Sequence, residues 1–315
     1  MSSFGFETTG AEVVEAFSDH VRDRTFLITG PSPDGIGAET ASCLAKAQPR
    51  LIVLAGRSPA KIQPVIDDIE AFQVPVEFVR LDLSDQNSVR GAVDTLRQRG
   101  TKIDVLINNA AIMACPYALT TDGIEMQFAT NHLGPFLFTN LLLQANLITE
   151  RIVNLNSSAS VRSASYLLEP LSDMTYGNGK SYDAVRAYGT SKMAVLLYTR
   201  ELAAKLRPRN ISVFTLNPGS IKSPLQRYMS DEMRQAALAT ARREDPDFVV
   251  PVRKTLQQGC STQLRAALDP FLVAQTGAYL DDCQVVEPQV HKDAYPATAN
   301  VWKLSEEMTG SAFGS

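Results

Sequence analysis

The chain has 315 residues, of which 44% are hydrophobic and 20% are charged, with a formal net charge of −4 and a pI near 5.5. This is an ordinary globular composition, and the lack of a basic run argues against nucleic acid as a partner. No apolar run approaches the roughly 20 residues that span a bilayer, and the N-terminus lacks the pattern of a signal peptide, so we expect a cytoplasmic protein without a membrane span. The four cysteines and three histidines are scattered, which predicts no metal site.

Strand and helix patterns alternate from residue 25 to 280, after an N-terminal helical extension (1–22) in which Thr9 is the expected N-cap. Apolar, β-branched runs predict strands at 25–29, 51–55, 76–81, 103–107, 151–156, 211–216 and 277–280. Such alternation is typical of a single doubly wound α/β domain of Rossmann type, with a parallel sheet flanked by helices. We therefore expect one domain over 1–315, in which 284–315 form a C-terminal tail and helix.

The first predicted strand runs into a glycine-rich loop that contains Gly30, Gly35 and Gly37, and a helical pattern follows. Glycines permit a tight turn and close backbone approach, and the N-terminus of a helix offers free N–H groups to a pyrophosphate. The loop by itself is also compatible with a plain turn between a strand and a helix.

The end of the second strand is where a dinucleotide fold meets the adenine ribose. A carboxylate there would accept from a 2′-hydroxyl, whereas an arginine would pair with a 2′-phosphate. Arg57 stands at this place without a carboxylate beside it, which favours NADP(H) over NAD(H). Lys61 is more simply a solvated helix lysine. After the third strand, Asp82 is expected either to reach the adenine amino group or to cap the next helix.

Small and polar residues follow the later strands, at the edge where open parallel sheets bind ligands. They are Asn108, Asn109 and Ala110 after the fourth strand, Ser157 and Ser158 after the fifth, and Asn217, Pro218 and Gly219 after the sixth. Asn131 lies in an otherwise apolar helical segment, where a buried amide needs partners that a functional water site would supply.

Tyr188 and Lys192 are four residues apart at the start of a long apolar-periodic segment, so both are expected on one face of a helix. A lysine charge near a tyrosine lowers the tyrosine pKa from its usual value of about 10, which suits proton transfer near neutrality. The alternative is a half-buried tyrosine beside a solvated lysine.

In this order the motifs resemble those of the short-chain dehydrogenase/reductase family, over nearly the whole chain. The motifs are Thr29-Gly30 with Gly35-Ile36-Gly37, Asn108-Asn109-Ala110, Asn131, Ser157, Tyr188-x-x-x-Lys192 and Asn217-Pro218-Gly219. Within the family, Arg57 and the stretches 179–183 and 277–283 are similar to the retinol-dehydrogenase-like and carbonyl-reductase-like branch.

The resemblance implies an NADPH-dependent oxidoreductase that interconverts a carbonyl and an alcohol by hydride transfer. Tyr188 would exchange the proton of the substrate oxygen, and Lys192 would hold the nicotinamide ribose. Ser157 would hydrogen-bond the substrate oxygen, and Asn131 would hold a water on a proton path. Counting from the fifth strand favours Ser157, but a slip of one residue would make Ser158 the catalytic serine.

The same resemblance implies a set of cofactor contacts. They are Gly30, Ser32, Gly35, Ile36, Gly37, Arg57, Asp82, Leu83, Asn109, Ala110, Tyr188, Lys192, Pro218, Gly219, Ile221 and Ser223. The loop has four residues between Gly30 and Gly35 where the family usually has three, which leaves open which amides meet the pyrophosphate.

Two segments, 160–185 and 224–250, are longer than plain connections and are expected to cover the substrate, the second as a helical lid or as an ordinary surface helix pair. Their apolar residues favour an uncharged, moderately sized small-molecule substrate. Other functions compatible with the motifs are an NADP(H)-binding sensor or scaffold without turnover, and reduction of an imine or activated C=C bond. The oligomeric state stays open, a homo-oligomer included.

Overall fold

The computed structural model describes residues 4–161, 171, 173–244, 247–290 and 294–313. Its centre is an eight-stranded sheet in the order β10-β9-β6-β5-β4-β1-β2-β3. The strands are β1 (Thr25–Thr29), β2 (Leu51–Gly56), β3 (Val76–Arg80), β4 (Ile103–Asn108), β5 (Ile148–Leu155), β6 (Ser212–Asn217), β9 (Tyr279–Asp281) and β10 (Gln284–Val286). Every neighbouring pair is parallel except β9 with β10.

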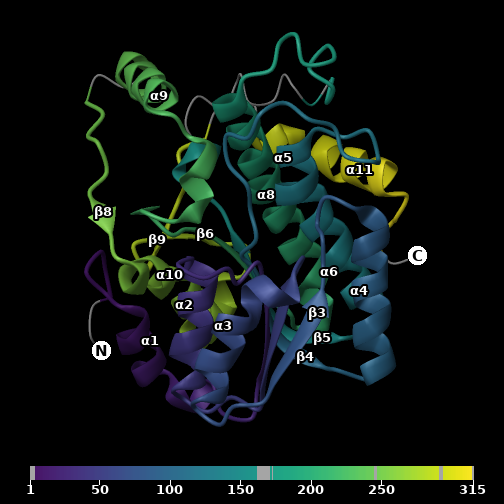
Figure 1. The fold of residues 1–315 in the computed structure, drawn as a ribbon, viewed down its shortest axis with the longest axis vertical. Coiled ribbons are helices and arrows are strands. Elements are labelled where there is room, and N and C mark those ends of the chain that lie inside the picture. Colours follow the sequence, from purple (N-terminus) through teal and green to yellow (C-terminus); the bar gives the residue numbers. More distant parts are fainter. Residues whose placement is uncertain (1–3, 162–170, 172, 245–246, 291–293, 314–315) are drawn as a thin grey trace.

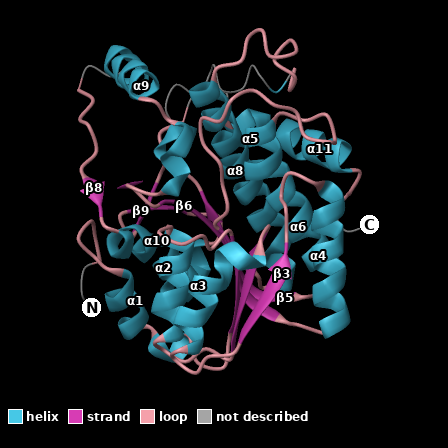
Figure 2. Cartoon of the chain, in the orientation of Figure 1, coloured by secondary structure: helices cyan, strands magenta, loops and turns pink. Residues whose placement is uncertain are grey.

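Helices cover both faces of this sheet (Figures 1 and 2). One layer holds α1 (Gly10–Ala16), α2 (Ile36–Ala45), α3 (Pro59–Glu70) and α10 (Leu256–Leu268); the other holds α4 (Gln86–Arg99), α6 (Gly134–Gln144), α8 (Ala184–Leu206) and α11 (Thr298–Thr309). The core of strand β1 is apolar because both of its faces are covered. Phe26 and Ile28 pack into the first layer, and Leu27 packs into the second. A strand covered on both faces has no polar side. The predicted doubly wound α/β domain is confirmed.

Helices α1 and α4 begin with a side-chain cap. Thr9 and Glu12 form a capping box at the start of α1, as the sequence predicts for Thr9. The alternative role given to Asp82, as cap of the next helix, is wrong. The cap of α4 is Asp85, while Asp82 accepts hydrogen bonds from the amide and hydroxyl of Ser84 at 3.0 and 2.6 Å.

Three short strands, β7 (Ser220–Ile221), β8 (Arg253–Lys254) and β10, were not predicted. Strand β10 lies in the stretch expected to be a tail, and it adds an antiparallel edge to the sheet. A separate two-stranded parallel sheet joins β7 to β8. Two or three residues show no periodicity, so such strands exist only through their pairing partners.

The two segments expected to cover the substrate are described in part. Segment 224–250 contains the 3₁₀ turn Pro224–Tyr228 and α9 (Asp231–Glu244), with 245–246 outside the described residues. Of segment 160–185, residues 162–170 and 172 lie outside them. Further 3₁₀ turns lie at Ser18–His20, Ser158–Ser160, Arg207–Arg209, Pro270–Gln275 and Tyr295–Ala297. No helix in the described part of the chain is both long enough and apolar enough to cross a membrane.

Candidate active site

The glycine-rich loop turns tightly between β1 and α2. Gly30 has a left-handed backbone (φ 64°), and a Cβ there would lie 2.7 Å from the Cβ of Ala110. The amide of Gly35 donates to the carbonyl of Ser32 at 3.1 Å, and Asp34 adopts φ 59°, so one compact turn absorbs the additional loop residue. Gly35 is the N-cap of α2 and has no side chain to cap it. The first amides of α2 are therefore free for an anionic ligand.

Asn109 fastens this loop to the end of β4. Its Nδ2 donates to the carbonyls of Thr29 at 2.8 Å and Gly30 at 3.1 Å. The hydroxyl of Thr29 accepts from the amides of Asn109 and Ala110 at 3.1 and 3.0 Å, a role that the sequence did not disclose. A side chain on Gly37 would overlap the Asn109 amide. The Oδ1 of Asn109 is buried and has no partner among the described residues, so the cradle keeps an acceptor for a ligand.

The residues at the predicted 2′-phosphate position are Arg57 and Ser58. Arg57 is exposed at the end of β2, and its guanidinium makes no ion pair or hydrogen bond with any residue that the structure describes. Ser58 is the N-cap of α3, yet its hydroxyl makes no capping hydrogen bond. A cationic group and a free hydroxyl at a helix N-terminus suit a phosphate. Lys61, one turn further on, is exposed on α3.

Tyr188 and Lys192 lie on α8, which Asp183 caps, and both are buried, with relative exposures of 5% and 3%. The Tyr188 hydroxyl lies near the side chain of Ser157, close enough for Ser157 to lower its pKa. The Nζ of Lys192 donates to the carbonyl of Leu155 at 2.8 Å and lies 5.9 Å from the centre of the Tyr188 ring. The structure thus brings Ser157, Tyr188 and Lys192 together at the end of β5.

Burial dominates the protonation of this group. It raises the pKa of Tyr188 to about 12, against a lowering effect of the neighbouring Ser157 side chain. It also lowers the pKa of Lys192 to about 7. The expectation that Lys192 lowers the tyrosine pKa is therefore wrong for this structure, because desolvation disfavours both charged forms.

Asn131 lies in a π-helical turn (Ala129–Leu133) between the short helix α5 (Met126–Phe128) and α6. Its Nδ2 donates to the carbonyl of Ile112 at 2.9 Å and to the hydroxyl of Ser191 at 3.0 Å, and its Oδ1 accepts from the amide of Ile112 at 2.8 Å. The side chain therefore ties the loop after β4 to α8. Both N–H groups of Asn131 and one lone pair of its Oδ1 are used by these bonds. A water molecule could therefore bind only to the second lone pair of Oδ1.

The loop after β6 closes the site on the other side. The Oδ1 of Asn217 accepts from the amides of Gly219 and Ser158, each at 3.3 Å. Ile221 is buried in β7, and Ser223 precedes the next 3₁₀ turn without a capping hydrogen bond. On the opposite side of the cradle, Leu83 is buried, and its carbonyl packs on Gly134 so closely that a side chain at Gly134 would not fit.

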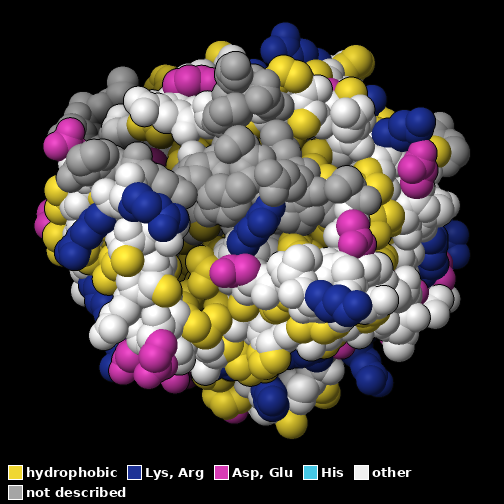
Figure 3. Space-filling view, turned by 90° about the horizontal axis from the view of Figure 1, so that it is seen from above, with side chains coloured by type: hydrophobic (Ala, Val, Ile, Leu, Met, Phe, Trp, Pro, Cys, Tyr) yellow, Lys and Arg dark blue, Asp and Glu magenta, His cyan; other side chains and the backbone are white. Residues whose placement is uncertain are grey.

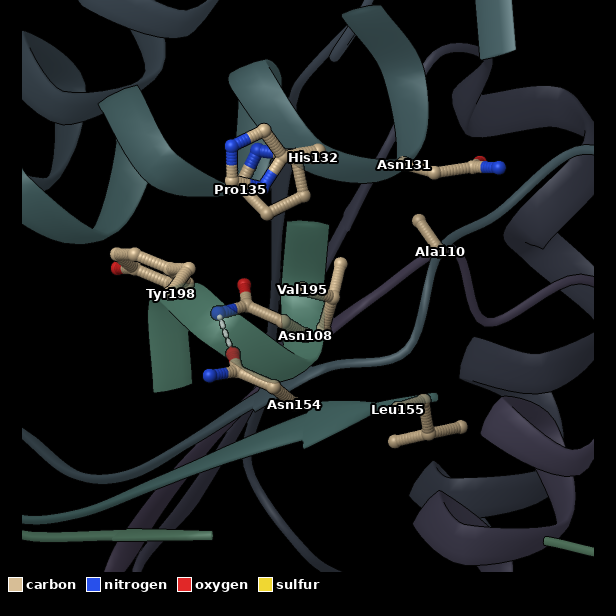
Figure 4. A pocket seen from close by; sticks show the side chains of 9 residues that line it. All are labelled: Asn108, Ala110, Asn131, His132, Pro135, Asn154, Leu155, Val195 and Tyr198. Carbon is tan, nitrogen blue, oxygen red and sulfur yellow. Dashed lines mark hydrogen bonds between the residues drawn. The ribbon is translucent and has the colours of Figure 1, made fainter. Parts of the chain in front are cut away.

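A cavity of about 10 Å³ lies behind these residues, between β4, β5, α6 and α8 (Figure 4). It is lined by Asn108, Ala110, Asn131, His132, Pro135, Asn154, Leu155, Val195 and Tyr198. Asn108 donates to Asn154 at 2.9 Å, and its oxygen points toward His132. That oxygen, the Nδ1 of His132 and the hydroxyl of Tyr198 are buried without a partner among the described residues. The volume and these three groups suit one water molecule.

The loop that leads into α8 is anchored by residues that sequence reasoning missed. Glu125 is fully buried and accepts from the amides of Gln127 and Phe128 at 2.9 and 2.7 Å. The hydroxyl of Tyr182 lies 3.2 Å from the same carboxylate and donates to the carbonyl of Cys115 at 3.0 Å. Burial raises the pKa of Glu125. No motif marks these residues, because their roles depend on contacts between distant segments.

A glycine-rich loop between a strand and a helix, and a buried tyrosine and lysine at the end of β5, are the features that define the site. Comparison with known proteins gives the family. The family model described as short chain dehydrogenase matches residues 24–167 and 175–234, and the chain belongs to this family. In the described residues no group of histidine, cysteine, aspartate or glutamate side chains is arranged to hold a metal ion.

Individual relatives place the chain in the retinol-dehydrogenase-like branch. Retinol dehydrogenase 12 of Mus musculus is 34% identical over 294 residues, which cover 91% of this chain and 86% of the relative. A solved structure of an uncharacterised protein from Mycobacterium Paratuberculosis has a TM-score of 0.69 at 30% identity, covering 95% of this chain and 98% of the other. The NADPH-bound carbonyl reductase from chicken fatty liver shares the fold, with a TM-score of 0.58 at 21% identity and coverages of 84% and 99%.

Proposed function

We propose that this protein is an NADP(H)-dependent oxidoreductase that interconverts a carbonyl and an alcohol, with Tyr188 as its acid and base. The observation that carries the proposal is the group of Ser157, Tyr188 and Lys192 at the end of β5, together with a glycine-rich loop whose helix has uncapped first amides. A protein that only bound the dinucleotide would need the cradle but not this group.

The residues divide the work of the reaction. Bound NADP(H) supplies or accepts the hydride, which is chemistry that no side chain provides. Tyr188, with its pKa raised to about 12, keeps its proton at neutral pH and can donate it to a carbonyl oxygen during reduction. Ser157 would hydrogen-bond the same oxygen and stabilise the charge that develops on it. Lys192 would hold the ribose next to the nicotinamide.

Tyr188→Phe tests the enzyme proposal. NADPH oxidation is measured with a panel of ketones and aldehydes that includes retinal, chosen because relatives are named retinol dehydrogenases. We expect the variant to lose roughly 10²–10⁴-fold in kcat, the usual contribution of general acid catalysis, while NADPH binding measured by fluorescence is kept. Equal rates in both proteins would favour a sensor or scaffold without turnover, and the identified products would reveal reduction of an imine or C=C bond instead.

We further propose that Arg57 selects NADPH over NADH through the 2′-phosphate. An exposed guanidinium that has no partner in the described part of the chain supports this role. Arg57→Ala should weaken the affinity for NADPH by about tenfold or more, because it removes one charge-assisted contact with the 2′-phosphate. The affinity for NADH, which has no 2′-phosphate, should stay nearly unchanged. Lys61→Ala, at an exposed lysine on the helix that follows Arg57, is the control and should change neither. Equal weakening of both cofactors by Arg57→Ala would overturn the assignment.

The substrate that we propose is uncharged and of moderate size. On the face seen in Figure 3, exposed hydrophobic side chains lie between scattered acidic and basic ones, and the described residues form no large patch of a single charge there. We also propose that segments 160–185 and 224–250 cover this substrate.

We propose a cytoplasmic location for the protein. Cell fractionation with an antibody to the native protein tests the location.

A further inference from the structure

We propose that Lys254 is a positioning residue for the cofactor, which supports the Pro218-Gly219 loop from behind and is itself held by the N-terminal extension. The inference rests on the proposed function in one respect, which is that Gly219 contacts the cofactor. Lys254 was not recognised in the sequence, where it follows the long segment after β6 and belongs to no motif.

The contact with the loop is made by the aliphatic stem of the lysine. Gly219 has φ 92°, and a Cβ built on it would lie 2.9 Å from Cδ and 3.1 Å from Cε of Lys254. The methylene groups therefore occupy the space that a side chain at position 219 would need. Pairing of β7 with β8 places Lys254 opposite Ile221, so the same strand also fixes the residues just after Gly219.

The ammonium group is buried by two other parts of the chain. The side chain of Lys254 is only 1% exposed, and its Nζ forms an ion pair with Asp282 at 2.5 Å. The ring of Phe6, from the N-terminal extension, lies under the same Nζ at 5.0 Å. A buried lysine charge is costly unless it is paired, so these two partners keep the stem against Gly219. The N-terminal extension thereby reaches the active site through one side chain.

The turn that supplies Asp282 has a left-handed backbone at both of its central residues. Asp282 and Cys283 have φ values of 45° and 62°, in a two-residue turn between β9 and β10, and of these two residues only the cysteine is unusual in such a turn. Helix α10 holds this turn, because the amide of Cys283 donates to the hydroxyl of Thr262 at 3.1 Å. A left-handed conformation at a cysteine persists only where the surroundings enforce it, and such places cluster at functional sites.

The test separates the stem from the charge. NADPH dissociation constants and melting temperatures are compared for the full-length wild type, Lys254→Met and Lys254→Ala. Lys254→Met keeps the methylene stem, so its affinity should stay within about threefold of wild type, whereas Lys254→Ala empties the space behind Gly219 and should weaken NADPH by about tenfold. Lys303→Ala, an exposed lysine on α11, is the control and should change neither quantity.

Each result supports or overturns the inference. Equal NADPH affinities of Lys254→Ala and Lys254→Met overturn it, even if the melting temperature of Lys254→Ala falls, because a purely structural lysine would lower stability and not cofactor affinity. If Lys254→Ala does not fold, Phe6→Ala and Asp282→Asn decide: both should weaken NADPH, and unchanged affinity in both overturns the inference. A wild type that binds neither NADPH nor NADH would instead refute the proposed function.

Discussion

The Nζ of Lys192 donates a hydrogen bond of 2.8 Å to the carbonyl of Leu155, and both residues are buried at the carboxyl end of β5. One neutral acceptor does not replace the water that a lysine charge loses on burial, which is why the pKa of Lys192 falls from 10.5 to about 7.

The lowered lysine pKa predicts a change of stability with pH. Between pH 7 and 10.5 the unfolded chain binds more protons at this site than the folded one, so the free energy of unfolding rises with pH across that window. Lys192→Met removes the group, and its unfolding free energy should rise less over the same interval than that of wild type. Urea unfolding at two pH values inside the window measures both proteins; parallel pH dependences would contradict the assignment.

A second prediction concerns Gly37, whose missing side chain makes room for the Asn109 amide. Gly37→Ala should displace Asn109 from the carbonyls of Thr29 and Gly30 and weaken NADPH by about tenfold or more, since a distorted loop loses its contacts with the pyrophosphate. Gly91→Ala is the control: it has open space around it inside α4, and should stabilise the protein by about 0.5–1 kcal/mol without changing affinity. Fluorescence titration and urea unfolding give both quantities.

We expect the buried His132 to make the folded state less stable in acid. It is buried among Phe128, Phe136 and Tyr198, and burial lowers its pKa from 6.5 to about 3. As pH falls from 6.5 toward 3, the unfolded state binds the additional proton and the free energy of unfolding decreases. His132→Phe should flatten this decrease, and should lose about 1 kcal/mol near neutrality with the hydrogen bond to Ser305. Unchanged acid sensitivity in the variant would exclude His132 as its source.

The N-terminal extension offers a fourth prediction. A Cβ on Gly10 would overlap the sulfur of Cys260 and approach Cδ1 of Leu264 to 2.9 Å. Gly10→Ala should therefore lower the free energy of unfolding by about 1–3 kcal/mol, the usual cost of overpacking a core. Gly5→Ala, where nothing lies within 4 Å, should change it little. Denaturant unfolding of the two variants side by side tests whether α1 is part of the cooperative core.

Most of the fold could be predicted because its signals are local. The strands from β1 to β6 are runs of apolar and β-branched residues, and each loop that holds a candidate site residue follows one of them. Parallel order then brings their carboxyl ends to one edge. Strand β10 and the pair of β7 with β8 could not be predicted, because two or three residues carry no periodicity and form strands only through a distant partner.

The sequence by itself determined which residues meet: the glycine loop, Arg57, Ser157, Tyr188 and Lys192 are found at one edge of the sheet, as their order along the chain predicts. Their electrostatics were decided by the tertiary structure alone. Burial raises the tyrosine pKa that a neighbouring lysine was expected to lower, and it makes Lys254, which no motif marks, the support of Gly219. Spacing along a chain fixes which side chains share a helix face, but desolvation depends on every segment packed around them.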